Sequence, residues 1–98
     1  MLAELKKHSP EEAREHRISL GFWLRELREE RGLSQRALAD LLSLDYYTFI
    51  SQLETGRGKI PAHRYTEWAK ALGQEPRSFV KVLMSYYHPT TYGILFDD

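Results

Sequence analysis

The sequence predicts an all-α domain of five helices, preceded by a short N-terminal helix and followed by an extended C-terminal tail. Two observations support this fold class. Apolar residues recur at helical spacing in successive stretches of the chain, the first formed by Leu20, Trp23, Leu24 and Leu27. Proline, glycine and serine lie between these stretches, where they start or end helices. The chain of 98 residues is long enough for one domain with a core of modest size.

Residues 1–18 are predicted to form a charged helical extension. The run Ser9-Pro10-Glu11-Glu12 has the capping-box pattern, with proline at the first helical position. We expect this short helix to end at about Arg17. The main domain would then occupy residues 19–88, and its first helix would end at Gly32 in a left-handed cap.

The second and third core helices are separated by a short turn. Ser34 is placed to be the N-cap of the second helix. The buried side of this helix would consist of Leu38, Ala39, Leu41 and Leu42. After the turn at 43–45, Asp45 is expected to cap a third helix over 46–54, which stops at Gly56.

The fourth and fifth helices are each opened by a proline. Pro61 opens the fourth helix and Gly73 ends it, while Pro76 opens the fifth and Pro89 stops it. Residues 89–98 form an apolar tail that is β-branched and aromatic in its sequence. One extended strand is not stable alone, so we expect the tail to pack back or to form a dimer interface. The candidate dimerisation residues are Tyr87, Tyr92, Ile94, Leu95 and Phe96.

The predicted third helix has one apolar and one uncharged polar side. A helical wheel places Tyr46, Phe49, Ile50 and Leu53 on the core side. The opposite side carries the candidate base-reading residues Tyr47, Thr48, Ser51 and Gln52. Short hydrogen-bonding side chains suit the DNA major groove, where glutamine can pair with adenine. The alternative is an ordinary solvated helix face. We expect Glu54 to turn away from this face and to pair with an arginine of the first or second helix.

The net charge is formally zero, but the charges are unevenly placed. The run RGKIPAHR at 57–64 contains three fixed cations and no acid. Gly56 and Gly58 would leave backbone N–H groups open to a phosphate. The candidate phosphate-binding residues are Gln35, Arg36, Thr55, Arg57 and Lys59. Because only this local strip is basic, we expect weak non-specific DNA binding with a shallow dependence on salt.

The stretches LRELREERGLSQRALADLL and FISQLETGRGKIP together resemble the Xre-type, lambda-repressor-like (Cro/C1-type) helix-turn-helix family. The resemblance spans about residues 20–83 and implies a five-helix DNA-binding domain that acts as a dimer on an inverted repeat. It also implies that Gln35 touches DNA, that the exposed side of the third helix reads bases, and that the 55–59 loop touches phosphate. The sequence departs from the family pattern in two respects. Ser43 stands at the usual turn glycine, and the 42–50 stretch is one residue longer.

Other classes of function have little support in the sequence. The chain has no cysteine, and its four histidines lack metal-ligand spacing, so we expect no metal or other cofactor. No nucleophile–base arrangement is present, so we expect no enzyme activity. The N-terminal stretch is too charged for a signal peptide or a membrane span, which favours a cytoplasmic protein that joins the nucleoid when bound to DNA.

The sequence therefore predicts a transcriptional regulator of bacterial or phage type. Its partner would be double-stranded DNA, and the favoured form is a homodimeric repressor that reads an inverted-repeat operator through the major groove. Two alternatives remain. One is an antitoxin that also autoregulates and has a toxin as its protein partner. The other is a helical protein-interaction module without DNA binding.

Overall fold

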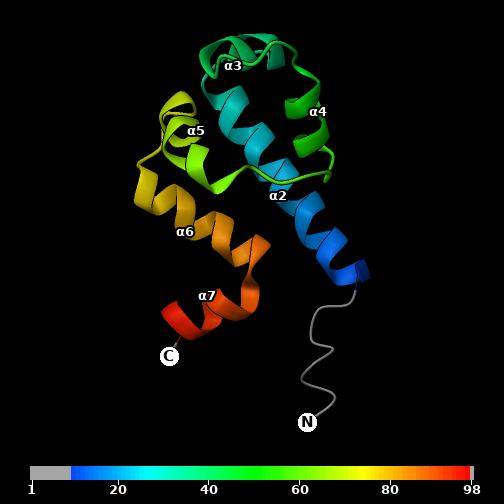
Figure 1. Cartoon of the computed structure of the whole chain (residues 1–98), viewed down its shortest axis with the longest axis vertical. Coiled ribbons are helices and arrows are strands. Elements are labelled where there is room, and N and C mark those ends of the chain that lie inside the picture. Colours follow the sequence, from blue (N-terminus) through cyan, green and yellow to red (C-terminus); the bar gives the residue numbers. More distant parts are fainter. Residues whose placement is uncertain (1–9, 98) are drawn as a thin grey trace.

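The computed structural model describes residues 10–97, and within this range the chain is all-α, as predicted. Residues 10–97 form six α-helices, and the first five of them pack around one core (Figure 1). A 3₁₀ turn, η1 (Ala62–Arg64), precedes α5. The helices are α2 (Pro10–Glu30), α3 (Gln35–Leu41), α4 (Thr48–Glu54), α5 (Tyr65–Ala71), α6 (Pro76–Tyr87) and α7 (Pro89–Phe96).

The predicted N-terminal helix and the first core helix are one continuous helix. α2 runs for 21 residues from Pro10 to Glu30, without a break near Arg17 or at the predicted boundary after residue 18. No proline interrupts this stretch, and Gly21 is tolerated within it because that position faces α4. The expected N-cap, Ser9, lies outside the described residues.

The caps at the junction of α2 and α3 follow the prediction. Gly32 has a φ of 69°, and the N–H groups of Gly32 and Leu33 donate to the carbonyls of Glu29 and Arg28. These two bonds form the Schellman pattern, which satisfies the carbonyls at the end of α2. Ser34 then caps α3, since its hydroxyl oxygen accepts from the N–H of Ala37 at 3.0 Å.

The turn between α3 and α4 differs from the prediction. Ser43 has a φ of 56°, a left-handed conformation that costs a non-glycine residue about 1 kcal/mol. α4 begins only at Thr48, and its N-cap is Tyr47 rather than Asp45. The expected place of Tyr46 on the core side is therefore wrong. Tyr46 precedes the helix in the longer turn, and its side chain is 72 % exposed.

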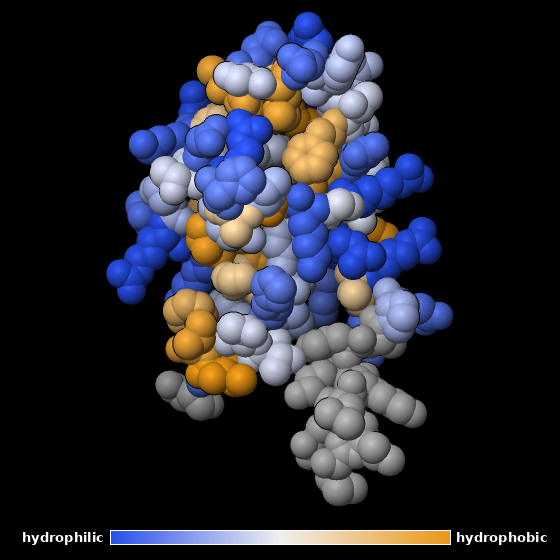
Figure 2. All heavy atoms as spheres, viewed as in Figure 1, coloured by the Kyte–Doolittle hydropathy of each residue, from blue (hydrophilic) through white to orange (hydrophobic). Residues whose placement is uncertain are grey.

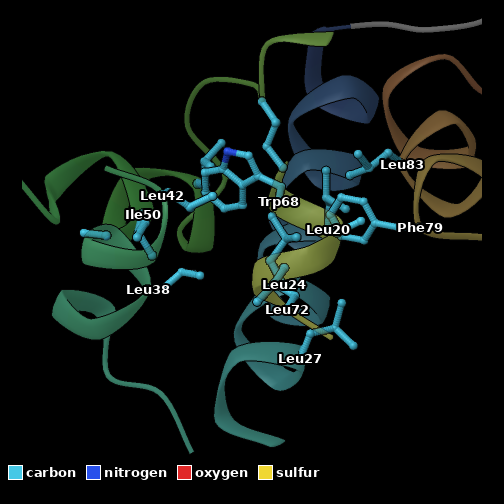
Figure 3. Packing of buried hydrophobic residues seen from close by; sticks show 14 of the residues in the cluster. Leu20, Leu24, Leu27, Leu38, Leu42, Ile50, Trp68, Leu72, Phe79 and Leu83 are labelled. Carbon is cyan, nitrogen blue, oxygen red and sulfur yellow. The ribbon is translucent and has the colours of Figure 1, made fainter. Parts of the chain in front are cut away.

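The core lies where α2, α3, α4, α5 and α6 meet (Figure 3). Trp68 on α5 is 1 % exposed, and the ring of Phe49 on α4 meets it edge-on at 6.2 Å. Trp23 is half-buried and stacks on Phe79 of α6 at 5.4 Å. Both tryptophans thus serve the core, and α4 is held by packing rather than by its own seven residues.

The C-terminal tail is a helix rather than the predicted extended segment. Pro89 ends α6 as expected, but it also occupies the first turn of α7, where its missing N–H costs nothing. α7 has no buried residue. Within α7 the ring centres of Tyr92 and Phe96 lie 5.0 Å apart. The Lys81 ammonium of α6 lies 4.7 Å from the centre of the Phe96 ring.

Candidate nucleic-acid interface

The exposed side of α4 holds the predicted base-reading residues. Tyr47, Thr48 and Gln52 are exposed, and Ser51 is half-buried. None of their side chains forms a hydrogen bond with another residue of the 10–97 range. Tyr47 lies at the N-cap and not within the helix. The four side chains therefore remain available to a ligand that presents donors and acceptors along a groove.

A close helix crossing fixes the far end of α4. A Cβ atom built on Gly21 of α2 would lie 2.5 Å from the carbonyl oxygen of Glu54 and 2.7 Å from that of Leu53. Only glycine permits this approach, because the atoms it meets belong to the α4 backbone. The end of α4 is thus positioned directly against α2.

Glu54 pairs with an arginine of the first helix, as the sequence predicts. The Nε and Nη2 atoms of Arg28 donate to the two carboxylate oxygens of Glu54 at 2.6 and 2.9 Å. The Arg28 and Glu54 side chains are only 10 % and 6 % exposed. The hydrogen bond to Glu54 raises the pKa of Arg28 above its usual value, although burial opposes this effect. The acid of α4 is thereby neutralised in the interior and removed from the exposed side.

Two predicted phosphate ligands on α3 already have partners within the subunit. The amide nitrogen of Gln35 donates to Glu54 Oε1 at 3.1 Å, so this side chain supports the ion pair. The Arg36 Nε atom lies 3.7 Å from a carboxylate oxygen of Asp40, in an exposed pair one turn apart. Both side chains lie near the start of α3, but their donors are shared with protein acceptors.

The loop after α4 presents cations and free backbone donors. Arg57 and Lys59 are exposed. Gly56 does not leave its N–H open as expected, because this group donates to the carbonyl of Leu53 at 3.1 Å. The N–H groups of Gly58 and Lys59, in contrast, have no acceptor among residues 10–97. Gly58 has a φ of 71°, which turns the backbone there toward solvent.

The Thr55 side chain is directed back toward α4. Its hydroxyl lies 3.0 Å from the carbonyl of Ser51 and 3.1 Å from that of Gln52, to which it donates. In this rotamer the hydroxyl proton forms a hydrogen bond within the last turn of the helix and is not available to a phosphate. Among residues 10–97, the donors of the loop without a hydrogen-bond acceptor are on Arg57, Gly58 and Lys59, and the Lys59 ammonium lies 5.4 Å from the centre of the Tyr87 ring.

Tyr87 does not lie on the surface as its predicted dimerisation role requires. It is 8 % exposed, and its hydroxyl accepts from the N–H of Ile60 at 3.1 Å. Burial raises the pKa of Tyr87 to about 12, while the bond from Ile60 opposes that shift. Tyr87 therefore anchors the end of the loop after α4 to α6. The other predicted interface residues, on α7, are exposed or half-buried.

The prediction missed two cations on the first half of α2. Arg14 and Arg17 line a shallow hollow together with Gly56, Arg57, Gly58 and Lys59. Arg17 Nε donates to the carbonyl of Gly56 at 3.4 Å. The three-residue spacing of the two arginines places them on one side of a helix. The sequence alone offered no sign that this side faces the loop.

Known proteins match the domain rather than the whole chain. A family model described as a helix-turn-helix domain matches residues 19–80. The crystal structure of the restriction-modification controller protein C.AhdI from Aeromonas hydrophila is similar at 37 % identity and a TM-score of 0.56, covering 63 % of this chain and 92 % of that one. No curated protein matches the chain. No helix within residues 10–97 is long and apolar enough to cross a membrane. The chain belongs to the helix-turn-helix domain family and is a non-enzymatic, DNA-binding transcriptional regulator with a lambda-repressor-like fold.

Proposed function

We propose that this regulator is a homodimeric repressor that reads an inverted-repeat operator through the major groove. The observation that carries the proposal is the charge pattern around α4. Its exposed side is uncharged, its one acid is paired internally with Arg28, and the loop that follows it is cationic. A duplex backbone repels exposed carboxylates and attracts such a loop, so α4 is suited to enter the groove.

Base reading is assigned to the four free side chains of α4. Gln52 can pair with an adenine through two hydrogen bonds, and Thr48 and Ser51 can bond to several base edges. The ring of Tyr47, 48 % exposed at the helix start, can meet a thymine methyl group. Tyr46 precedes α4 and is even more exposed, so it lies at the edge of the same surface.

Phosphate contacts would seat each subunit on the duplex. The guanidinium of Arg57, the ammonium of Lys59 and the free N–H groups of Gly58 and Lys59 are the donors of the loop. Such contacts fix register without selecting sequence. Gln35 contributes by holding Glu54 in place, and Arg36 contributes where its exposed pair with Asp40 opens.

A second copy of this chain would cover α7. Ile94, Leu95 and Phe96 are 77 %, 65 % and 44 % exposed, and Tyr92 lies half-buried beside them. Figure 2 shows hydrophobic side chains gathered at the end of the molecule where α7 lies. Apolar residues gathered in this way mark an interaction surface. In the usual geometry of helix-turn-helix dimers the two half-sites lie about 34 Å apart, and we expect the same spacing for this dimer.

The similarity to a controller protein supports gene regulation over the antitoxin and protein-interaction alternatives. Occupation of a promoter by such a dimer would block polymerase. The protein would act in the cytoplasm, on the nucleoid.

Selection of bound duplexes from a random DNA pool tests the reading side. The wild type should enrich an inverted repeat, while the Gln52→Ala, Ser51→Ala double variant should lose or relax that preference. Thr66→Ala, an exposed position on α5, is the matched control and should enrich the same repeat. A folded wild type that enriches no sequence at low salt would contradict the proposal.

Sedimentation equilibrium tests the dimer. Ile94→Ser with Leu95→Ser should shift the protein toward monomer, because these side chains would be buried only between subunits. Phe22→Ser serves as the control, since Phe22 is a similarly exposed apolar residue on α2, at 61 %. Equal association constants for the wild type and the α7 variant would show that α7 is not part of the interface.

A further inference from the structure

The first half of α2 forms a cationic hollow with the loop after α4. Its lining contains four cations and no acidic side chain: Arg14, Arg17, Arg57 and Lys59, with Gly56 and Gly58 between them. Arg14 and Arg57 form no ion pair within the described range. The positive charges gathered in this way repel one another, and a bound anion would offset that repulsion.

Close backbone contacts hold the two sides of the hollow together. A Cβ atom on Gly56 would lie 2.7 Å from the Ile18 side chain and 3.1 Å from its backbone. Arg17 Nε donates to the Gly56 carbonyl at 3.4 Å. Because α2 is unbroken from Pro10, Arg14 lies one turn before Arg17 on the same side. The arginines are therefore carried by a rigid helix and not by a separate arm.

The position of the hollow favours a phosphate of the DNA backbone as its anion. The loop begins where α4 ends, and Figure 1 shows it returning across α2. A duplex that receives α4 in its major groove would place backbone phosphates against this loop. The same backbone would then run past Arg14 and Arg17.

We infer that Arg14 and Arg17 form a second phosphate-binding element. It would bind the DNA backbone next to the phosphate held by the Gly58–Lys59 loop. This inference rests on the proposed DNA contact through α4. It adds residues that precede the matched family range of 19–80. It also predicts a steeper dependence of binding on salt than Arg57 and Lys59 alone would give.

Salt titration of binding to a random-sequence duplex pool tests the inference. The slope of log K against log salt changes by about 0.9 for each phosphate contact. Arg14→Gln should therefore flatten the slope by about 0.9 per subunit, and Arg14→Gln with Arg17→Gln by about 1.8. Lys70→Gln with Arg77→Gln removes the same charge from exposed positions on α5 and α6 that do not line the hollow, and should leave the slope unchanged.

One further variant and one further measurement separate the phosphate contact from folding and from base reading. Arg17→Lys keeps the charge and should retain the wild-type slope, even if the bond to the Gly56 carbonyl is lost. Arg14→Gln should enrich the same inverted repeat as the wild type, because a phosphate contact carries no sequence information.

The outcomes distinguish this inference from the proposed function. Equal slopes for wild type and Arg14→Gln would overturn the inference while leaving the regulator intact. An altered sequence preference in Arg14→Gln would also overturn it, since the arginine would then read a base. A folded wild type that binds no duplex at low salt would overturn both the inference and the proposed function.

Discussion

Two helix contacts in this molecule are built in opposite ways. At the crossing of α2 and α4, Gly21 lets two backbones meet, and the buried pair of Arg28 and Glu54 joins the helices. At the corner of α6 and α7, the contacts are between side chains, and α7 has no buried residue. The first contact fixes the position of α4, while the second leaves four of the eight residues of α7 exposed.

The two helices depend on their contacts to different degrees. α4 has seven residues and is too short to be stable alone, so its position depends on packing against α2. α7 has eight residues, and its apolar side chains Ile94, Leu95 and Phe96 are exposed. The base-reading role proposed for α4 needs a fixed position, whereas the interface role proposed for α7 needs exposed surface. The two contacts should therefore differ in energy as well as in geometry.

The largest effect should come from breaking the buried ion pair. Arg28→Met leaves the Glu54 carboxylate buried without its partner, which should lower the free energy of unfolding by about 3–5 kcal/mol. Urea denaturation followed by circular dichroism measures this change. Arg25→Met is the matched control, because the pair of Arg25 and Glu29 is more than half exposed and should contribute about 0–1 kcal/mol. Equal losses in the two variants would show that burial does not matter here.

A smaller effect should come from filling the helix crossing. Gly21→Ala forces the α2 and α4 backbones apart and should cost about 1–3 kcal/mol. Gly93→Ala in α7 is the control. Its added Cβ would meet nothing closer than Asp97 Oδ2 at 3.6 Å, so the better helix propensity of alanine should leave stability unchanged or slightly raised. Thermal denaturation of the two variants gives the comparison directly. If Gly21→Ala is as stable as the wild type, the α2 and α4 backbones can move apart at the crossing without loss of stability.

The smallest effect should come from the bond that ties the loop to α6. Tyr87→Phe leaves the buried N–H of Ile60 without an acceptor, which should cost about 1–2 kcal/mol at neutral pH. The folded-state pKa of about 12 lies above the ordinary value of 10.0, so the fold holds the phenol proton more tightly than the unfolded chain does. The associated stability is present below pH 10.0 and is lost as the pH rises toward about 12.

Denaturation of wild type and Tyr87→Phe across this alkaline range is the measurement. The wild type should lose stability more steeply than the variant. Burial also raises the pKa of Tyr65, which is present in both proteins, and the charge of ionised Tyr65 in turn raises the pKa of Tyr87 in the wild type. Parallel pH curves would show that Tyr87 titrates as an exposed phenol.

Much of the candidate site was readable from local sequence. Gly32 and Ser34 act within one turn of their own positions, so their caps could be predicted. The uncharged side of the third helix follows from helical spacing alone. The pairing of Glu54 with an arginine could be anticipated, because an unpaired acid on that helix conflicts with a nearby DNA backbone. The caps and the uncharged side depend on residues close together in the sequence, whereas the pairing of Glu54 was anticipated from its charge.

The tertiary structure decided the rest, because the deciding contacts join residues far apart in the chain. The crossing of Gly21 with α4 sets the position of that helix, and α2 also places Arg14 and Arg17 beside the loop. Packing of Tyr87 against Ile60 makes it a core residue rather than an interface residue. Local sequence fixes where a helix can begin and what each side of it offers. Only packing decides which side meets the core and which is left for DNA.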